Sequence, residues 1–175
     1  MTTIIAVETA HGVSIGYDSM CSSGGEKFEL EHPKVFTNNG AIYGVAGRLL
    51  LSTELCYADL PAPPKKKHKT DRWVTRELSP HIRDIIDSVM PKRDDDGVEC
   101  QFLVIANGRA YEISGDSGWH RRTDGIYAIG SGCDLARGAL MAGANINKAL
   151  EIAADHDAGT GYDFTTCSAA DMLDE

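Results

Sequence analysis

Two asparagine-glycine pairs constrain how this chain can fold. Asn39-Gly40 and Asn107-Gly108 each lie between two short apolar runs. Both residues of such a pair tolerate the positive φ that a type I′ turn requires, so each pair predicts a β-hairpin. Hairpins join antiparallel strands, and they therefore argue against the alternating strand and helix order of a doubly wound parallel sheet.

The apolar pattern along the chain predicts strands before and after two groups of helices. We expect strands at 3–7, 13–17, 34–37, 41–46, 100–106, 109–113, 118–121, 126–129 and 162–167. We expect helices at 48–59, 74–89, 134–142 and 146–155, and an acidic loop at 94–97. Asn145 is the expected cap of the last helix. This order favours an α+β fold with antiparallel sheets covered by helices.

Pro80 leaves two interpretations of the stretch 74–89. A proline inside a helix removes a hydrogen-bond donor and bends the helix. Ser79 followed by Pro80 is also typical of a helix start, with a serine cap and a first-turn proline. The stretch is therefore either a kinked helix or a turn that leads into a helix at Ser79.

Length and charge exclude several classes of protein. With 175 residues, the chain suffices for one well-buried core, and we expect a single domain over residues 1–175. The net charge of -9 argues against a nucleic-acid partner, because phosphates would be repelled. The basic run at 65–69 is expected to be a solvated loop; the alternative is a docking patch for an acidic partner.

The five cysteines form no CxxC pair, so neither a zinc site nor a disulfide framework is expected. Reduced thiols are typical of the cytoplasm, and we expect a cytoplasmic protein. No apolar run approaches the roughly 20 residues that span a bilayer, so no membrane partner is expected.

Common catalytic motifs are missing from the sequence. The run that begins at Gly130 resembles GxGxxG but has Leu135 in place of the third glycine. There is no GxxxxGK[ST] phosphate loop, no HExxH and no GxSxG, and the six histidines show no metal-ligand spacing. The chemistry has to come from other residues.

Thr2 gains two functional groups if Met1 is removed: a hydroxyl nucleophile and a free α-amine that can act as its base. The amine, with a pKa of about 7.7–8.0, is substantially neutral near pH 7. Lys34 would favour the alkoxide by its charge, and Asp18 would orient Lys34. The alternative is that Asp18 and Lys34 form a surface ion pair or serve as turn residues.

Five motifs in order, from Thr2 to Gly132, resemble the β subunits of proteasomes and HslV-like peptidases. They are Thr2-Thr3, Gly16-Tyr17-Asp18, Pro33-Lys34-Val35-Phe36, Val45-Ala46-Gly47 and Tyr127-Ala128-Ile129-Gly130-Ser131-Gly132. The resemblance extends to about Thr160. It implies an amino-terminal nucleophile hydrolase with a four-layer α-β-β-α sandwich.

The resemblance also implies the roles of individual residues. Thr2 would be the nucleophile, with its freed amine as base, and Asp18 and Lys34 the supporting charges. The N–H of Gly47 would form the oxyanion hole. Ser131 would bind near the threonine amine, and Asp157 would lie near the active site.

The same resemblance implies how substrate and a cation would bind. An extended substrate would lie against Ser22 and Gly47. Its side chain would enter a pocket formed by Cys21, His32, Val45 and Leu50. Backbone carbonyls of Ala154, Asp157 and Thr160 would hold a monovalent or divalent structural cation that the chemistry does not require. The alternative for this last segment is a simple helix C-terminus ended by Gly159 and Gly161.

These implications together describe a threonine-type endopeptidase. We expect it to form a homo-oligomeric ring in which Thr2 faces an enclosed chamber, to cut peptides or unfolded proteins, and to be fed by an ATP-dependent unfoldase. Methionine aminopeptidase would expose Thr2. Two alternatives stay open: a stand-alone amidohydrolase that acts on small amides, and an inactive proteasome-like scaffold that retains Met1.

Overall fold

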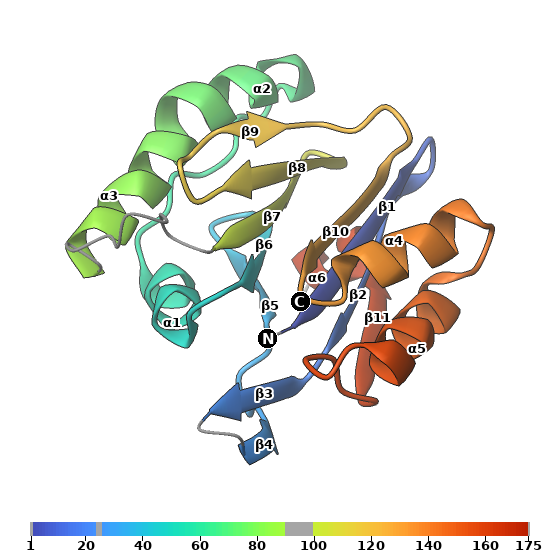
Figure 1. Cartoon of the computed structure of the whole chain (residues 1–175). Helices are drawn as coiled ribbons and strands as arrows, with labels where there is room; N and C mark the ends of the chain where they lie inside the picture. Colours follow the sequence, from blue (N-terminus) through green and yellow to red (C-terminus); the bar gives the residue numbers. More distant parts are fainter. Residues whose placement is uncertain (1, 24–25, 90–99, 175) are drawn as a thin grey trace.

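The computed structural model of the chain describes residues 2–23, 26–89 and 100–174 (Figure 1). Met1 and the acidic loop expected at 94–97 lie outside these residues. Within the described ranges, no helix is both long enough and apolar enough to cross a membrane.

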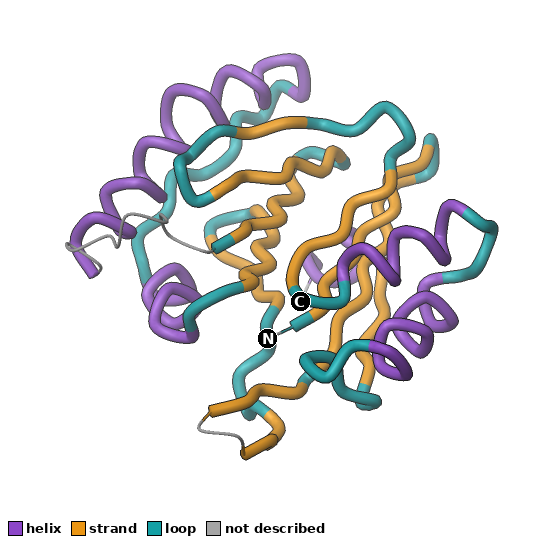
Figure 2. The backbone as a smooth tube through the Cα atoms, in the orientation of Figure 1, coloured by secondary structure: helices purple, strands orange, loops and turns teal. Residues whose placement is uncertain are grey.

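Two antiparallel sheets form the centre of the molecule (Figure 2). The first sheet has the strand order β10 (Ile126–Gly130), β1 (Thr3–Thr9), β2 (Gly12–Asp18) and β11 (Phe164–Ser168). The second has the order β5 (Val35–Asn38), β6 (Ala41–Ala46), β7 (Gln101–Ala106), β8 (Arg109–Ser114) and β9 (Trp119–His120). A separate hairpin consists of β3 (Met20–Ser23) and β4 (Glu26–Glu29).

Both asparagine-glycine hairpins are confirmed. Asn39 and Gly40 have φ values of 49° and 84°, and they join β5 to β6. Asn107 and Gly108 have φ values of 54° and 67°, and they join β7 to β8. These left-handed conformations are the ones that asparagine and glycine tolerate best.

The helices are α1 (Leu49–Tyr57), α2 (Thr70–Trp73), α3 (Ser79–Val89), α4 (Cys133–Met141), α5 (Ile146–His156) and α6 (Ala169–Asp174). Helices α1, α2 and α3 lie on one outer side of the strands and α4 and α5 on the other, whereas α6 packs on β2, β11 and β6 (Figure 1). The expected cap of α5 is confirmed, because the Asn145 side chain accepts a hydrogen bond from the N–H of Lys148. The basic run is not entirely a loop: Lys67–Lys69 form a short 3-10 helix, η1, that leads into α2.

Pro80 lies at the start of α3, directly after a π-helical segment, η2 (Val74–Leu78). Proline has no N–H to continue the regular ladder, and a π-helical turn accommodates the break. Ser79 has helical dihedrals of -60° and -42°. It is therefore not a cap, and the interpretation of one distorted helix is correct.

Three hydrophobic clusters connect these elements. The first packs α1, α2 and α3 on the second sheet, the next lies between the two sheets, and the last packs α4 and α5 on the first sheet. Successive residues of a strand face opposite sides. Ile4 of β1 accordingly lies between the sheets, whereas Ile5 lies under α4 and α5. In β6, Ile42 lies between the sheets, whereas Tyr43 lies under the helices on the second sheet. Both faces of each sheet are therefore covered.

Sequence analysis missed the β3–β4 hairpin and α6. The hairpin carries the sequences MCSS and EKFE, and every residue of β4 is exposed. No burial-driven alternation marks such strands, because neither of their faces has to be apolar. Helix α6 has only six residues, too few to show a helical period.

Candidate active site

Thr2 lies immediately before β1, and its side chain is buried. β1 pairs antiparallel with β2, so the start of β1 lies beside the end of β2, where Asp18 is the last residue. The Thr2 hydroxyl donates to Asp18 Oδ1 at 3.3 Å, and the N–H of Thr3 donates to the same oxygen at 2.8 Å. These two hydrogen bonds fix the beginning of β1 against Asp18.

Lys34 completes a buried cluster with these two residues. Its Nζ donates to Asp18 Oδ1 at 2.9 Å, and the two side chains are 5% and 0% exposed. The N–H of Gly161 donates to the other carboxylate oxygen, Oδ2, at 3.0 Å. The alternative of a surface ion pair is therefore wrong. Thr2, Asp18 and Lys34 are called the Thr2 cluster below.

The environment of Lys34 shifts its titration. Burial lowers the pKa of Lys34, and the charge and hydrogen bond of Asp18 raise it by a smaller amount. Removal from water disfavours the ammonium form, whereas a nearby carboxylate favours it. Because Lys34 and the Thr2 hydroxyl share one oxygen of Asp18, a positive charge lies where it would favour a threonine alkoxide.

A second polar network approaches Thr2 from β10 and the end of α5. The Ser131 hydroxyl donates to Asp157 Oδ2 at 2.7 Å and lies 3.5 Å from the Thr2 carbonyl oxygen. The Thr160 hydroxyl donates to the same Asp157 oxygen at 2.7 Å and lies 2.6 Å from the Thr3 hydroxyl. Burial raises the pKa of Asp157, but the hydrogen bonds from Thr160 and Ser131 outweigh it and hold this pKa below its usual value.

The glycines beside Ser131 allow this close approach. Gly130 pairs with Thr3 in the sheet and has a φ of 93°. A Cβ atom on Gly130 would collide with the Thr2 carbonyl oxygen, and one on Gly132 would collide with the Thr3 hydroxyl. Glycine on both sides of Ser131 therefore allows the end of β10 to pack closely against the start of β1.

Gly47 lies at the end of β6, before α1, with a φ of 136° that favours glycine. The N–H of Val45 donates to the Lys34 carbonyl at 3.2 Å, so the residues leading into β5 lie opposite the end of β6. Gly47 therefore follows the strand that flanks Lys34.

The predicted substrate-binding residues differ in burial and in their distance from the Thr2 cluster. Cys21 lies near enough to Lys34 to contribute to raising its pKa, and Ser22 follows Cys21 in β3. Val45 is buried in the core under the helices, whereas His32 and Leu50 are exposed. Among the hydrogen bonds and ion pairs of the described residues, none joins His32 or Leu50 to the Thr2 cluster.

The predicted cation ligands Ala154, Asp157 and Thr160 belong to the last turn of α5 and the loop after it. The Asp157 carbonyl accepts a hydrogen bond from the N–H of Thr160 at 3.1 Å. In the described part of the chain, no group of three or more histidine, cysteine or acidic side chains could hold a metal ion. Helix α5 ends at His156, before either of the glycines proposed to end it.

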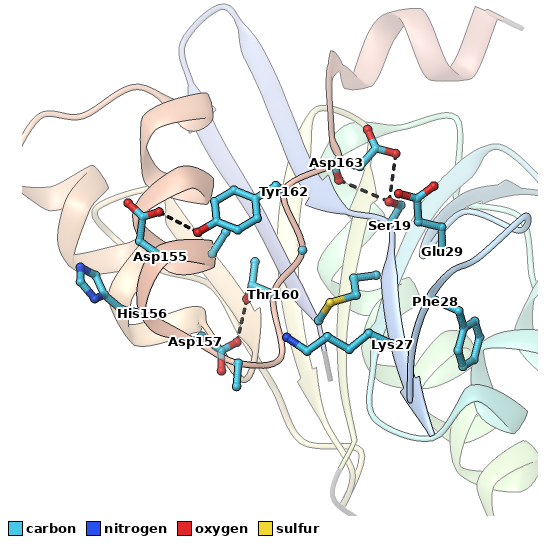
Figure 3. A pocket seen from close by; sticks show the side chains of 14 residues that line it. Ser19, Lys27, Phe28, Glu29, Asp155, His156, Asp157, Thr160, Tyr162 and Asp163 are labelled. Carbon is cyan, nitrogen blue, oxygen red and sulfur yellow. Dashed lines mark hydrogen bonds between the residues drawn. The ribbon is translucent and has the colours of Figure 1, made fainter. Parts of the chain in front are cut away.

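Figure 3 shows a groove of about 580 Å³. It adjoins the Thr2 cluster, because the N–H of its lining residue Gly161 donates to Asp18. One wall is the β3–β4 hairpin, and the other is the end of α5 with the loop into β11. Met20, Asp157 and Gly161 are among its lining residues. Sequence analysis did not find this groove, because one of its walls was not recognised as a hairpin.

Comparison with known proteins shows which fold this is. No protein-family model matches the chain, and no curated protein matches it. The crystal structure of eukaryotic HslV from Trypanosoma brucei matches with a TM-score of 0.68 and 22% identity, over 95% of this chain and 98% of that one. The chain has the HslV fold. The resemblance to proteasome β subunits and HslV-like proteins is thus confirmed in its fold.

Two further structures share the HslV fold with this chain. Thiobacillus denitrificans BPH matches with a TM-score of 0.76 and 18% identity, over 95% of this chain and 96% of that one. BPH in complex with epoxomicin matches with a TM-score of 0.76 and 16% identity, over 95% and 97%. At these identities the likeness concerns the fold, so the function has to be argued from the residues around Thr2.

Proposed function

We propose that this chain is a threonine-type endopeptidase of the proteasome and HslV kind. One observation carries the proposal: the hydroxyl of Thr2 and the ammonium of buried Lys34 bind the same oxygen of Asp18, at the start of the first strand of an HslV fold. We further propose that residues 1–175 form one domain, a four-layer α-β-β-α sandwich, supported by the two sheets and the helices packed on their outer faces.

Catalysis would begin after removal of Met1. The freed α-amine of Thr2 takes the hydroxyl proton, directly or through a water, and the oxygen attacks the carbonyl carbon of the peptide bond. Lys34 stabilises the forming alkoxide, and Asp18 holds Lys34 in place. The carbon–nitrogen bond then breaks, the proton passes to the departing amine, and an ester on Thr2 remains. Water hydrolyses that ester and restores the hydroxyl.

Gly47, Ser131 and Asp157 would support these steps. The N–H of Gly47 donates to the oxyanion that forms on the attacked carbonyl. The hydroxyl proton of Ser131 is directed at Asp157, so its oxygen can accept a hydrogen bond from the threonine amine. The lowered pKa of Asp157 keeps it a carboxylate, and hence an acceptor for Ser131, at neutral pH.

Substrate would bind as an extended strand along Ser22 and Gly47, with a side chain directed towards Cys21, His32, Val45 and Leu50. Epoxomicin binds a protein of this fold, and we expect it to inhibit this one through Thr2. We also propose a homo-oligomeric ring with an ATP-dependent unfoldase as partner. A cation on Ala154, Asp157 and Thr160 would be structural only.

Replacement of the nucleophile tests the proposal. Thr2→Ala should abolish hydrolysis of fluorogenic peptides, whereas Thr2→Ser, which retains a hydroxyl, should retain part of it. Circular dichroism checks that both variants are folded. Intact-mass measurement on protein from its native cell should show that Met1 is removed. Unchanged peptide hydrolysis by Thr2→Ala would contradict the proposal.

Particle mass separates the two alternatives from the ring peptidase. A monomer that hydrolyses small amides through Thr2 would be a stand-alone amidohydrolase. A ring that retains Met1 and hydrolyses nothing would be a scaffold. Light scattering together with intact mass distinguishes the three.

A further inference from the structure

We propose that the groove beside the Thr2 cluster binds a basic side chain of the substrate, that of lysine or arginine. This inference rests on the proposed peptidase function and adds a substrate preference to it. The groove is formed by the β3–β4 hairpin and by the end of α5 with the loop into β11 (Figure 3). We call it the acidic groove, after four of its lining residues: Glu29, Asp155, Asp157 and Asp163.

The acidic groove shares its walls with the Thr2 cluster. Met20, which lines it, follows Asp18 by two positions, and the N–H of Gly161, also in its lining, donates to Asp18 Oδ2 at 3.0 Å. Asp157 lines the groove and accepts the hydrogen bond of Ser131, whose hydroxyl is 3.5 Å from the Thr2 carbonyl. A peptide bound at Thr2 therefore has this groove within reach of its neighbouring side chains.

The charge of the groove favours a cation. Its lining contains four carboxylates and one ammonium, that of Lys27. The described hydrogen bonds to two of the carboxylates come from neutral hydroxyls: Tyr162 donates to Asp155 at 2.9 Å, and Ser19 donates to Asp163 at 3.1 Å. A hydroxyl donor leaves the negative charge of a carboxylate in place, so the groove as a whole attracts positive charge.

Lys27 shows how a basic side chain can lie in this groove. Figure 3 shows its side chain extended across the groove, with the ammonium directed towards Asp157 and Thr160. A lysine or arginine side chain can bury its apolar stem while its charged end remains among polar groups. Tyr162 borders the groove and is 67% exposed, so its ring offers apolar surface for such a stem. Lys27 would compete with the substrate for the carboxylates.

The acidic groove is distinct from the pocket predicted around Cys21. Neighbouring residues of a strand face opposite sides. Met20 faces the groove, whereas Cys21 lies near Lys34 and contributes to raising its pKa. The two sites thus lie on opposite faces of β3, and different residues of an extended substrate would fill them.

Peptide pairs test this preference. Quenched fluorescent peptides that differ by lysine or glutamine at one position are compared, with that position moved along both sides of the cleaved bond. We expect kcat/KM to be roughly fivefold higher with lysine than with glutamine at one position, which is the gain that one partly exposed ion pair would give. The ratio should fall towards one at high salt, because screening weakens exposed charges.

Variants assign the preference to the groove. Glu29→Gln combined with Asp155→Asn should bring the lysine-to-glutamine ratio close to one, and Lys27→Met should raise it. The matched control is Asp84→Asn on α3, an exposed carboxylate outside the groove, which should leave the ratio unchanged. Affinity of the Thr2→Ala variant for the same peptides gives a second readout that does not depend on turnover.

The outcomes separate this inference from the function on which it rests. A ratio near one at every position, or a ratio that the double variant leaves unchanged, overturns the acidic groove as a basic-residue site while Thr2-dependent hydrolysis stands. Hydrolysis that survives Thr2→Ala overturns the peptidase proposal instead. Equal affinity of Thr2→Ala for the lysine and glutamine peptides also counts against the groove.

Discussion

The Thr2 cluster and the acidic groove share a wall but differ in their exposure to water. Asp18 and Lys34 are almost completely buried, and Asp18 accepts four hydrogen bonds. Asp155 and Glu29 are exposed. A buried charge pair is strongly coupled and costly to break, whereas exposed charges are screened. In the proposed peptidase, the buried Thr2 cluster would carry the catalysis and the exposed acidic groove would set the substrate preference.

Removing Lys34 should have the largest effect. Lys34→Ala leaves the Asp18 carboxylate buried without its cation, which costs about 3–5 kcal/mol of folding free energy. Peptide hydrolysis should be lost as well. Urea denaturation measures the free energy of unfolding. The control is Lys148→Ala, which breaks the exposed pair with Glu151 and should cost less than about 1 kcal/mol. Equal costs for the two variants would contradict the comparison.

The approach of β10 to Thr2 is tested by a pair of glycines. Gly130 and Gly143 have nearly equal φ values of 93° and 95°, but only a Cβ on Gly130 meets a backbone atom, the Thr2 carbonyl oxygen. Gly143→Ala should cost about 1 kcal/mol for its backbone conformation. Gly130→Ala should cost about 1–3 kcal/mol more, because of the overlap. Thermal denaturation measures the difference, and similar losses would show that close packing at Thr2 is unimportant.

Asp157 belongs to both regions, and its contribution to the free energy of unfolding should depend on pH in the acid range. Its folded pKa is lowered, so its carboxylate stabilises the protein above its unfolded pKa of about 3.9. That stabilisation is lost as the pH falls through the folded pKa. We expect Asp157→Asn to be less stable than the wild type at pH 7, and the two to converge below about pH 4. Urea denaturation across this range checks the convergence, and a constant difference would be inconsistent with the lowered pKa.

The exposed carboxylates of the groove should matter least for stability. Asp155→Asn retains a hydrogen-bond acceptor for Tyr162 and should change the free energy of unfolding by less than about 0.5 kcal/mol. Urea denaturation beside the wild type measures it. A loss as large as that of Lys34→Ala would show that the groove is structural and would remove the contrast between the two regions.

The two regions were also unequally predictable. Motif order along the chain pointed to Thr2, Asp18 and Lys34, and the structure brings these three together through hydrogen bonds. The acidic groove could not be predicted, because its hairpin has short, exposed strands without apolar alternation. Ser131 was expected near Thr2, but its hydrogen bond to Asp157 joins positions 26 apart, directly after β10 and directly after α5. No local pattern encodes such a contact.

Sequence alone determined the two asparagine-glycine turns, the order of the longer strands and helices, and the candidacy of Thr2, because these depend on neighbouring residues and on the periodicity of apolar side chains. Only the tertiary structure decided that Asp18 and Lys34 are buried and that the hairpin after β2 encloses a groove with the end of α5. The physical reason is that burial depends on pairings such as β1 with β10, which bring Thr3 beside Gly130.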